Sequence, residues 1–159
     1  MHRAERKRIR RPPDVYLDGG RIFSVTCAVR DRRPVFADLA FGHECVGVLR
    51  AMRDRTGAKV FAYCCMPDHA HLVLSPPHAQ SLPAFVGEWK ARCYQARRRR
   101  GAMEPFWQRS FFDHALRTDA ELHAVVAYVL ENPVRAGLVG DRRDYPLSGS
   151  FELTFDGAR

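Results

Sequence analysis

The stretch KVFAYCCMPDHAHLVLS, from Lys59 to Ser75, predicts two neighbouring strands joined by a tight connection. Residues 59–65 are apolar on both faces, which is typical of a central strand. After Met-Pro-Asp, residues 69–74 begin with two histidines at alternate positions. Because residues i and i+2 of a strand point to the same face, His69 and His71 are expected to stand side by side. The opposite face would carry Ala70, Leu72 and Leu74.

Regular patterns on both sides of this stretch extend the prediction to a whole domain. In chain order, they are a strand at 21–29, a helix at 38–55, a helix at 82–100 and a strand at 111–117. The order strand–helix–strand–strand–helix–strand predicts an α+β fold, the ferredoxin-like or RRM-like plait. In that plait an antiparallel sheet has its helices on one face, which leaves the other face for a site.

A last helix is predicted, and both its start and its end are marked in the sequence. Thr118 and Glu121 form a capping box, in which a hydroxyl and a carboxylate bind free backbone amides. Pro133 disfavours helical geometry at the residue before it, so the helix is expected to end near Asn132. The apolar stripe consists of Leu122, Val125, Val126 and Val129. Tyr128 and Asn132 lie together on one flank of that stripe, four residues apart.

The length of 159 residues favours one domain with a core of its own. An apolar content of 46% argues against global disorder. The predicted organisation is a basic arm at 1–15, a domain at 16–150 and a short tail at 151–159. No apolar run approaches the roughly 20 residues that span a bilayer, and the N-terminus lacks the apolar segment of a signal peptide. We therefore expect a cytoplasmic protein without a membrane partner.

The five cysteines are an odd number without a C-x-x-C pair, and we expect them to be reduced and partly buried. Cys64 and Cys65 are close to the two histidines in sequence, which suggests a zinc site as an alternative. Neighbouring residues of a strand point to opposite faces, however, so the two thiols would not easily join one tetrahedral site.

The charge balance points to a polyanion as the partner. The chain has 26 Lys and Arg against 18 Asp and Glu, a net charge of +8. Basic residues cluster at 3–11 and again at 90–100, which ends in four arginines. The second cluster lies inside a predicted helix, which favours a nucleic-acid surface over a solvated tail.

Three segments in order, MPDHAHLVLS, FWQRSFFDHALR and YVLENPVRAGLV, make the chain resemble a known family. It is similar to the REP-associated tyrosine transposases, which belong to the single-tyrosine HUH transposase superfamily, named for its His-hydrophobic-His strand. The resemblance extends from about Phe23 to Ser150 and includes the YPLSGS after the last helix. The His-x-His pattern alone is weak, and the Tyr-x-x-x-Asn-Pro-Val-x-x-Gly block behind it makes the set specific.

The resemblance implies the ferredoxin-like fold and assigns roles to four residues. His69 and His71 correspond to the histidine pair that binds a divalent metal, Mg²⁺ or Mn²⁺. Asn132 corresponds to the third ligand, one helical turn beyond the nucleophile, which corresponds to Tyr128. Tyr94 is a second tyrosine in a basic segment, but it lacks an asparagine one turn later.

His114 and Glu121 are two further candidates for the site. His114 projects from the strand before the last helix and matches a family motif position. A site histidine, a DNA contact and a core histidine all remain open for it. Glu121 lies on the flank of the last helix that carries Tyr128, so its carboxylate would approach the same region.

The chemistry implied by the resemblance suits these residue types. A phosphodiester repels nucleophiles, and a metal that polarises a non-bridging oxygen stabilises the transition state. A phenol is a weak nucleophile at neutral pH until a positive charge or a base assists it. Attack by Tyr128 would give a covalent 5′-phosphotyrosine and a free 3′-hydroxyl, and the stored bond energy would allow rejoining without ATP.

By resemblance, the substrate is single-stranded DNA flanked by imperfect palindromes that fold as hairpins. The protein is expected to be a nucleoid-associated monomer. The basic residues expected to follow the phosphates are Arg6, Lys7, Arg8, Arg10, Arg97, Arg98, Arg99, Arg100 and Arg109. Each such contact would steepen the salt dependence of binding. Trp107 is the candidate for stacking on an unpaired base.

Two other functions fit parts of the sequence. A non-catalytic nucleic-acid binder on an RRM-like sheet would explain the charge and the fold, but not the combination of histidines, tyrosine and asparagine. A replication or conjugation initiator of the same superfamily usually has a longer chain, and often more site histidines or a second tyrosine. The compact length favours the transposase-like interpretation.

Overall fold

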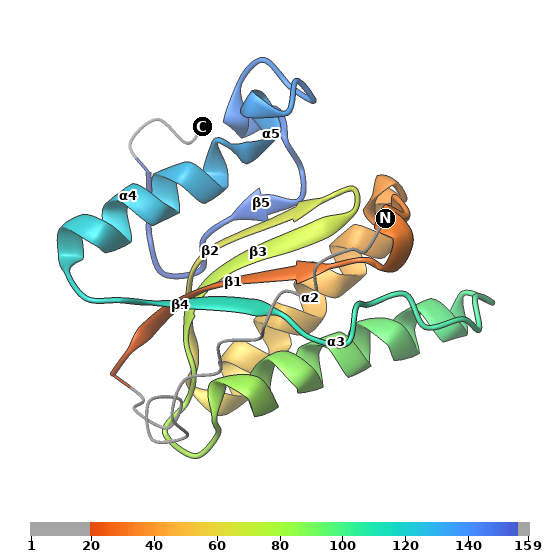
Figure 1. Ribbon diagram of the computed structural model, residues 1–159, viewed down its shortest axis with the longest axis horizontal. Helices are drawn as coiled ribbons and strands as arrows, with labels where there is room; N and C mark the ends of the chain where they lie inside the picture. Colours follow the sequence, from red (N-terminus) through yellow and green to blue (C-terminus); the bar gives the residue numbers. More distant parts are fainter. Residues whose placement is uncertain (1–19, 156–159) are drawn as a thin grey trace, which may run out of the picture.

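A five-stranded antiparallel sheet forms the centre of the computed structural model, which describes residues 20–155 (Figure 1). The strands are β1 (Ile22–Ala28), β2 (Lys59–Met66), β3 (His69–Ser75), β4 (Phe112–Leu116) and β5 (Ser148–Gly149). Their order across the sheet is β4-β1-β3-β2-β5, and every neighbouring pair is antiparallel. The first four strands confirm the predicted plait, and the two-residue β5 extends the sheet beside β2.

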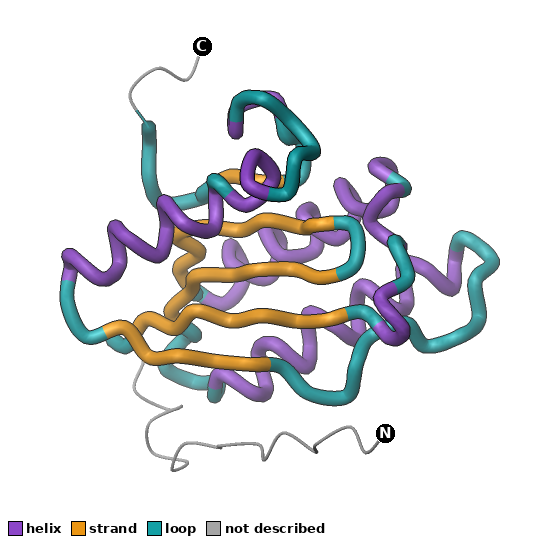
Figure 2. Tube along the Cα trace, turned by 45° about the horizontal axis from the view of Figure 1, so that its top comes forward, coloured by secondary structure: helices purple, strands orange, loops and turns teal. Residues whose placement is uncertain are grey.

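Two long helices, α2 (Leu39–Thr56) and α3 (Leu82–Arg99), cover one face of the sheet (Figure 2). The side chain of Asp38 begins α2 by accepting a hydrogen bond from the Phe41 amide. Gly57 ends it with a φ of 77°, a left-handed conformation that glycine adopts without strain. Within the described residues, no helix combines the length and the apolar character needed to cross a membrane.

The core lies between the sheet and these two helices. The residues of β1 and β3 that face the helices are all buried: Phe23, Val25, Cys27, Ala70, Leu72 and Leu74. Trp89 of α3 is also fully buried, and its indole N–H donates to the Cys45 carbonyl oxygen at 3.1 Å. The one polar atom of the Trp89 side chain is therefore paired.

The third long helix, α4 (Asp119–Leu130), packs against β2 and β3 on the opposite face of the sheet (Figure 2). It begins at the predicted capping box, where the Thr118 hydroxyl accepts a hydrogen bond from the Glu121 amide at 3.1 Å. The buried residues of α4 are Val126, Val129 and Leu130. The two helices of the predicted plait, α2 and α3, thus lie on one face as expected, and α4 is a further helix on the other face. Since α2 and α3 fill their face, α4 buries its apolar side on the other face, which carries the histidines.

A C-terminal segment, from Tyr145 to Phe155, closes the β2 edge of the sheet. The Tyr145 hydroxyl donates to the Cys65 carbonyl oxygen at 2.6 Å. Leu147 is fully buried against Gly42 of α2, at a position where a larger residue would clash with it. This close approach joins the segment to both the sheet and the helical layer.

Glu152 anchors the end of this segment. Its carboxylate accepts two hydrogen bonds from the Arg53 guanidinium, at 2.9 and 3.0 Å, and one from the Val60 amide at 3.2 Å. The hydrogen bond from Arg53 is the largest cause of the lowered pKa of Glu152. Phe151, Leu153 and Phe155, within the segment predicted as a tail, pack against the core. Residues 156–159 lie outside the described part.

We expect Glu152→Gln to lower the free energy of unfolding by about 1–3 kcal/mol near neutral pH, because it removes a charge-assisted pair with Arg53. The pKa of Glu152 in the fold lies below the unfolded value of about 4.3. Its carboxylate therefore stabilises the fold above that value and loses its contribution as the pH falls through the folded pKa. Urea unfolding of both proteins at neutral and acid pH measures the difference, which should shrink in acid.

Glu104→Gln is the matched control for this prediction. Glu104 pairs with Arg33 at 3.6 Å, and its side chain is 87% exposed, against 13% for Glu152. An exposed pair of this kind contributes less than about 1 kcal/mol. Equal losses in the two variants would show that Glu152 contributes no more than an ordinary surface charge.

Candidate active site

The two histidines of β3 are the centre of a hydrogen-bonded chain on the face of the sheet opposite α2 and α3. Their Nε2 atoms lie 3.1 Å apart, and the two rings are close to perpendicular. The Nδ1 atom of His69 lies 2.6 Å from Asp68 Oδ1, and the Nδ1 atom of His71 lies 3.0 Å from Thr26 Oγ1. The histidines thus stand side by side, as the spacing in the sequence predicts.

Asp68 and Thr26 fix the orientation of the two rings. Asp68 ends the connection between β2 and β3, and Thr26 lies directly opposite His71 on β1. An imidazole N–H held by a carboxylate leaves the other ring nitrogen as a lone-pair donor, as in metal-binding histidines. A hydroxyl both donates and accepts, so Thr26 suits either neutral tautomer of His71. The sequence alone does not identify either residue, although Asp68 stands immediately before His69.

The environment of His71 keeps its ring neutral. Burial is the largest cause, and with the charges of His69 and Arg135 it lowers the pKa of His71 to about 4. At pH 7 the ring therefore keeps a lone pair on one nitrogen. A neutral imidazole is the form that binds metal ions.

The two Nε2 atoms have the spacing of neighbouring ligands of one metal ion. Metal–imidazole bonds of about 2.0–2.1 Å at a right angle place their nitrogens about 3 Å apart. Within residues 20–155, no group of three or more His, Cys, Asp or Glu is arranged to hold a metal, which leaves the zinc alternative at Cys64 and Cys65 without support. Amide oxygens also serve as ligands for hard divalent ions.

Tyr128 lies near the end of α4, and 59% of its surface is exposed. Arg135 covers its ring, with the guanidinium carbon 3.8 Å from the ring centroid. The Nη2 atom of Arg135 donates to the Tyr128 carbonyl oxygen at 2.7 Å and to Asn132 Oδ1 at 3.1 Å. Arg135 belongs to α5 (Asn132–Arg135), a single helical turn that follows α4. One arginine thus joins the two residues predicted to be nucleophile and third ligand.

Asn132 has a buried amide nitrogen without a partner. Its Nδ2 atom makes no hydrogen bond within the part of the chain that the structure describes. An unpaired buried polar group is unfavourable, and such groups occur at functional positions. The amide oxygen has two lone pairs, so Oδ1 can accept from Arg135 and still offer a lone pair to a metal ion. The α5 turn packs against β2, and the Arg135 charge contributes to the lowered pKa of His71, so Asn132 and the histidines share one face.

His114 and Glu121 also lie on this face. His114 pairs with Ser24 on β1, and its Nε2 atom lies 2.7 Å from Glu121 Oε1. The Arg117 amide donates to the other oxygen of Glu121 at 2.8 Å. These bonds, with the Arg117 amide as the largest cause, lower the pKa of Glu121. The structure brings the two candidates together as a pair at the start of α4, and 60% of the His114 side chain is exposed.

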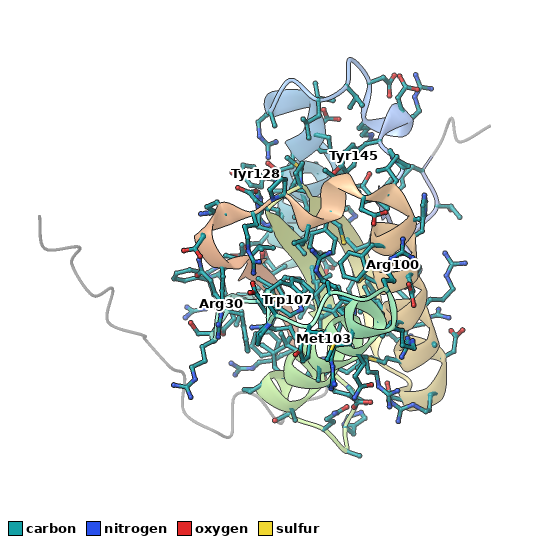
Figure 3. The ribbon with its side chains drawn as sticks, turned by 90° about the vertical axis from the view of Figure 1, so that its right-hand side faces the viewer. Arg30, Arg100, Met103, Trp107, Tyr128 and Tyr145 are labelled. Carbon is teal, nitrogen blue, oxygen red and sulfur yellow. The ribbon has the colours of Figure 1, made fainter. Side chains whose placement is uncertain are left out.

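The basic residues at the end of α3 are partly engaged with the protein itself. Arg99 and Arg100 form ion pairs with Glu44, and Arg97 lies over the ring of Phe41. Figures 1 and 3 place this end of α3, with Arg100 and Met103, well away from Tyr128. Arg98 and Arg109 are exposed. The other predicted phosphate contacts, Arg6, Lys7, Arg8 and Arg10, lie outside the described residues.

Trp107 does not have the exposed ring that stacking on a base requires. It is only 7% exposed, and its ring packs against Phe36, Trp89 and Phe106. The cause is a β-bridge between Trp107 and Val29, which draws the segment after α3 onto the end of β1. Trp107 is therefore a core residue in this structure.

Both the sequence and the fold are similar to those of known proteins. Residues 22–132 match the family model described as "Transposase IS200 like". The chain is 27% identical to the REP-associated tyrosine transposase of Escherichia coli (strain K12) over 133 residues, which cover 84% of this chain and 78% of that protein. Its fold is similar to a solved structure of a REP-associated tyrosine transposase bound to a REP hairpin. The TM-score is 0.67 at 22% identity, over 81% of this chain and 76% of the other.

Proposed function

The chain belongs to the IS200-like transposase family, and on that basis we propose that it cuts and rejoins single-stranded DNA next to hairpins. The reaction would use a divalent metal and a covalent 5′-phosphotyrosine intermediate. The related protein of known structure is bound to a REP hairpin, and the net charge of +8 suits such a partner here. We expect this protein to act as a monomer.

The observation that carries the proposal is the histidine pair. Two imidazoles whose Nε2 atoms lie 3.1 Å apart, each with its Nδ1 held by a second polar group, are prepared for one shared ligand. His69 and His71 would hold the metal with Asn132 as the third ligand. The metal would be Mg²⁺ or Mn²⁺, and when bound it would polarise a non-bridging oxygen of the scissile phosphate. A purely structural histidine pair would not need this alignment.

Tyr128 would be the nucleophile. Its phenol oxygen would form a bond to phosphorus as the bond from phosphorus to the 3′-oxygen of the preceding nucleotide breaks. The phenol proton would pass to solvent water, and the departing 3′-oxygen would take up a proton from solvent, so the step is proton-neutral overall. The exposed ring suits attack on a large substrate, and the guanidinium of Arg135 would favour negative charge developing on the phenol.

The proposal is tested by looking for the covalent product. The wild-type protein is incubated with labelled single-stranded hairpin DNA taken from palindromes beside its own gene, with and without Mn²⁺. A denaturing gel should show a protein–DNA adduct only with the metal. Tight binding without an adduct on several hairpins and metals would instead support a binding protein that has the fold of a transposase.

We expect Arg135→Met to slow adduct formation about 10- to 100-fold, with hairpin affinity within about threefold of wild type. The variant loses both Nη2 hydrogen bonds and the contact with the Tyr128 ring, so the nucleophile and Asn132 are less well positioned. Adduct rates are measured at saturating Mn²⁺, and affinity is measured by fluorescence anisotropy. Arg143→Met is the control, because Arg143 is exposed and pairs with Asp141 outside this site. An unchanged rate in Arg135→Met would exclude a role for Arg135 in positioning.

A further inference from the structure

Phe112 is an exposed aromatic residue on a sheet that buries most others. Among the residues that the structure describes, the largely exposed aromatic side chains are Phe112 and Tyr128, each 59% accessible. A single exposed apolar side chain is common on protein surfaces, so a contact for this ring is inferred from where the ring lies. Tyr128 has a place in the proposed reaction, whereas Phe112 does not yet have one.

The pairing of the strands places Phe112 on the same face as the histidines. Phe112 lies directly opposite Thr26 on β1, and Thr26 lies directly opposite His71 on β3. Residues directly opposite each other in antiparallel strands project to the same face. The ring is therefore two strands from His71, about 10 Å between backbones. The path between them passes over Thr26, whose hydroxyl contacts His71 at 3.0 Å.

Within residues 20–155, the part of this face that no helix covers is the part that contains Phe112. The α4 helix packs over β2 and β3, while β4 forms the opposite edge of the sheet (Figure 2). Arg109 is exposed three residues before Phe112. A strand of DNA that crossed β4 and β1 toward β3 would meet this flat ring before the histidine pair, and Arg109 adds a positive charge near the ring in sequence. A guanidinium suits a phosphate of the DNA, and an aromatic ring suits a base.

We propose that Phe112 stacks on one unpaired base of the DNA strand that enters the active site. The inference rests on the proposed function, because it takes single-stranded DNA as the substrate. Aromatic side chains on an open sheet face bind bases in this way in RRM domains, and stacking suits any base because each has a flat π-face. The positive net charge favours a nucleic acid over a second copy of this chain as the occupant.

The test compares a hairpin that carries a short unpaired tail with the same hairpin without the tail. We expect Phe112→Ala to weaken binding of the tailed hairpin about tenfold and to leave binding of the blunt hairpin unchanged. Phe112→Tyr should restore the affinity, because it restores the ring. Leu39→Ala is the control, since Leu39 is 47% exposed at the start of α2 in the helical layer. Affinities are measured by anisotropy with the full chain.

Abasic sites in the tail identify the base that stacks. In the wild type, one abasic position should weaken binding about tenfold, and the same position should have no further effect in Phe112→Ala. The proposal is overturned if the abasic site and Phe112→Ala each weaken binding independently of the other. It is also overturned if Phe112→Ala weakens binding of tailed and blunt hairpins equally, or if the wild type binds no tailed hairpin. A shift of the protein from dimer to monomer in Phe112→Ala would also overturn it, because the ring would then cover a second copy. If Phe112→Ala weakens binding of the tailed hairpin but the wild type forms no adduct, the proposed reaction is wrong and the stacking proposal is supported. If the wild type forms the adduct but Phe112→Ala binds the tailed hairpin as tightly as the wild type, the stacking proposal is wrong and the proposed reaction is supported.

Discussion

Tyr128→Phe is expected to abolish the covalent protein–DNA adduct, with a loss on the order of 10⁴-fold or more. The change removes one oxygen atom, which in the proposed reaction is the atom bonded to phosphorus. The ring and its contact with Arg135 at 3.8 Å would remain, so the fold and the hairpin affinity should be preserved. Adduct on a denaturing gel and affinity by anisotropy, measured on the same preparation, separate chemistry from binding.

Tyr94→Phe is the matched control for this experiment. Tyr94 also lies on a helix in a basic region, but its hydroxyl donates to the Met103 carbonyl oxygen at 2.7 Å and has a structural use. Adduct formation should therefore be unchanged apart from a small loss of stability of about 1 kcal/mol. An adduct that persists in Tyr128→Phe and disappears in Tyr94→Phe would reassign the nucleophile.

His71→Ala is expected to weaken Mn²⁺ binding by more than about 100-fold and to reduce adduct formation to background, since it deletes one of the two converging Nε2 atoms. The protein is titrated with Mn²⁺ in the absence of DNA, and the EPR signal of free Mn²⁺ is monitored. This measures metal affinity without any reaction. This readout distinguishes a ligand from a residue that only supports the fold. Asp68→Asn should have a smaller effect of about 10- to 100-fold, because it loosens the orientation of His69 without removing a ligand.

His78→Ala is the control for the histidine substitutions. His78 is exposed in the loop that follows β3, so metal affinity and adduct formation should remain at the wild-type level. A wild-type protein that binds no Mn²⁺ in the absence of DNA, together with full activity in His71→Ala, would contradict the assignment of the histidine pair.

The parts of the fold that follow from the sequence are those encoded locally. Alternation in residues 69–74 places the histidines, and Thr118 with Glu121 marks the start of α4 before any contact is known. An apolar stripe indicates that a helix packs, but not on which face of a sheet, so the position of α4 could not be predicted. The two-residue β5 has no pattern of its own. It depends on Leu147 meeting Gly42, which is a contact between distant parts of the chain.

In the candidate site too, some residues can be identified from the local sequence, and others only from contacts between distant parts of the chain. The histidine pair follows from spacing, and Tyr128 with Asn132 follows from the resemblance of a short motif. Thr26 could not be found because its contact with His71 depends on the register of two strands 45 residues apart in sequence. The sequence predicts an exposed, base-stacking ring at Trp107 for a similar reason. The ring is buried because its segment returns to β1, and this long-range contact is not visible in the local sequence.

The arrangement of the five buried cysteines gives the protein an internal reporter of its own opening motions. Cys64 lies opposite His71 on the α4 side of the sheet, and burial raises its pKa to about 12. Cys27 and Cys65 face the helical layer, and burial likewise raises the pKa of each. Such thiols react with iodoacetamide only when the overlying structure lifts. The alkylation rate of Cys64 therefore reports the detachment of α4 from the sheet, while the rates of Cys27 and Cys65 report the separation of α2 and α3, so one reaction gives two local free energies.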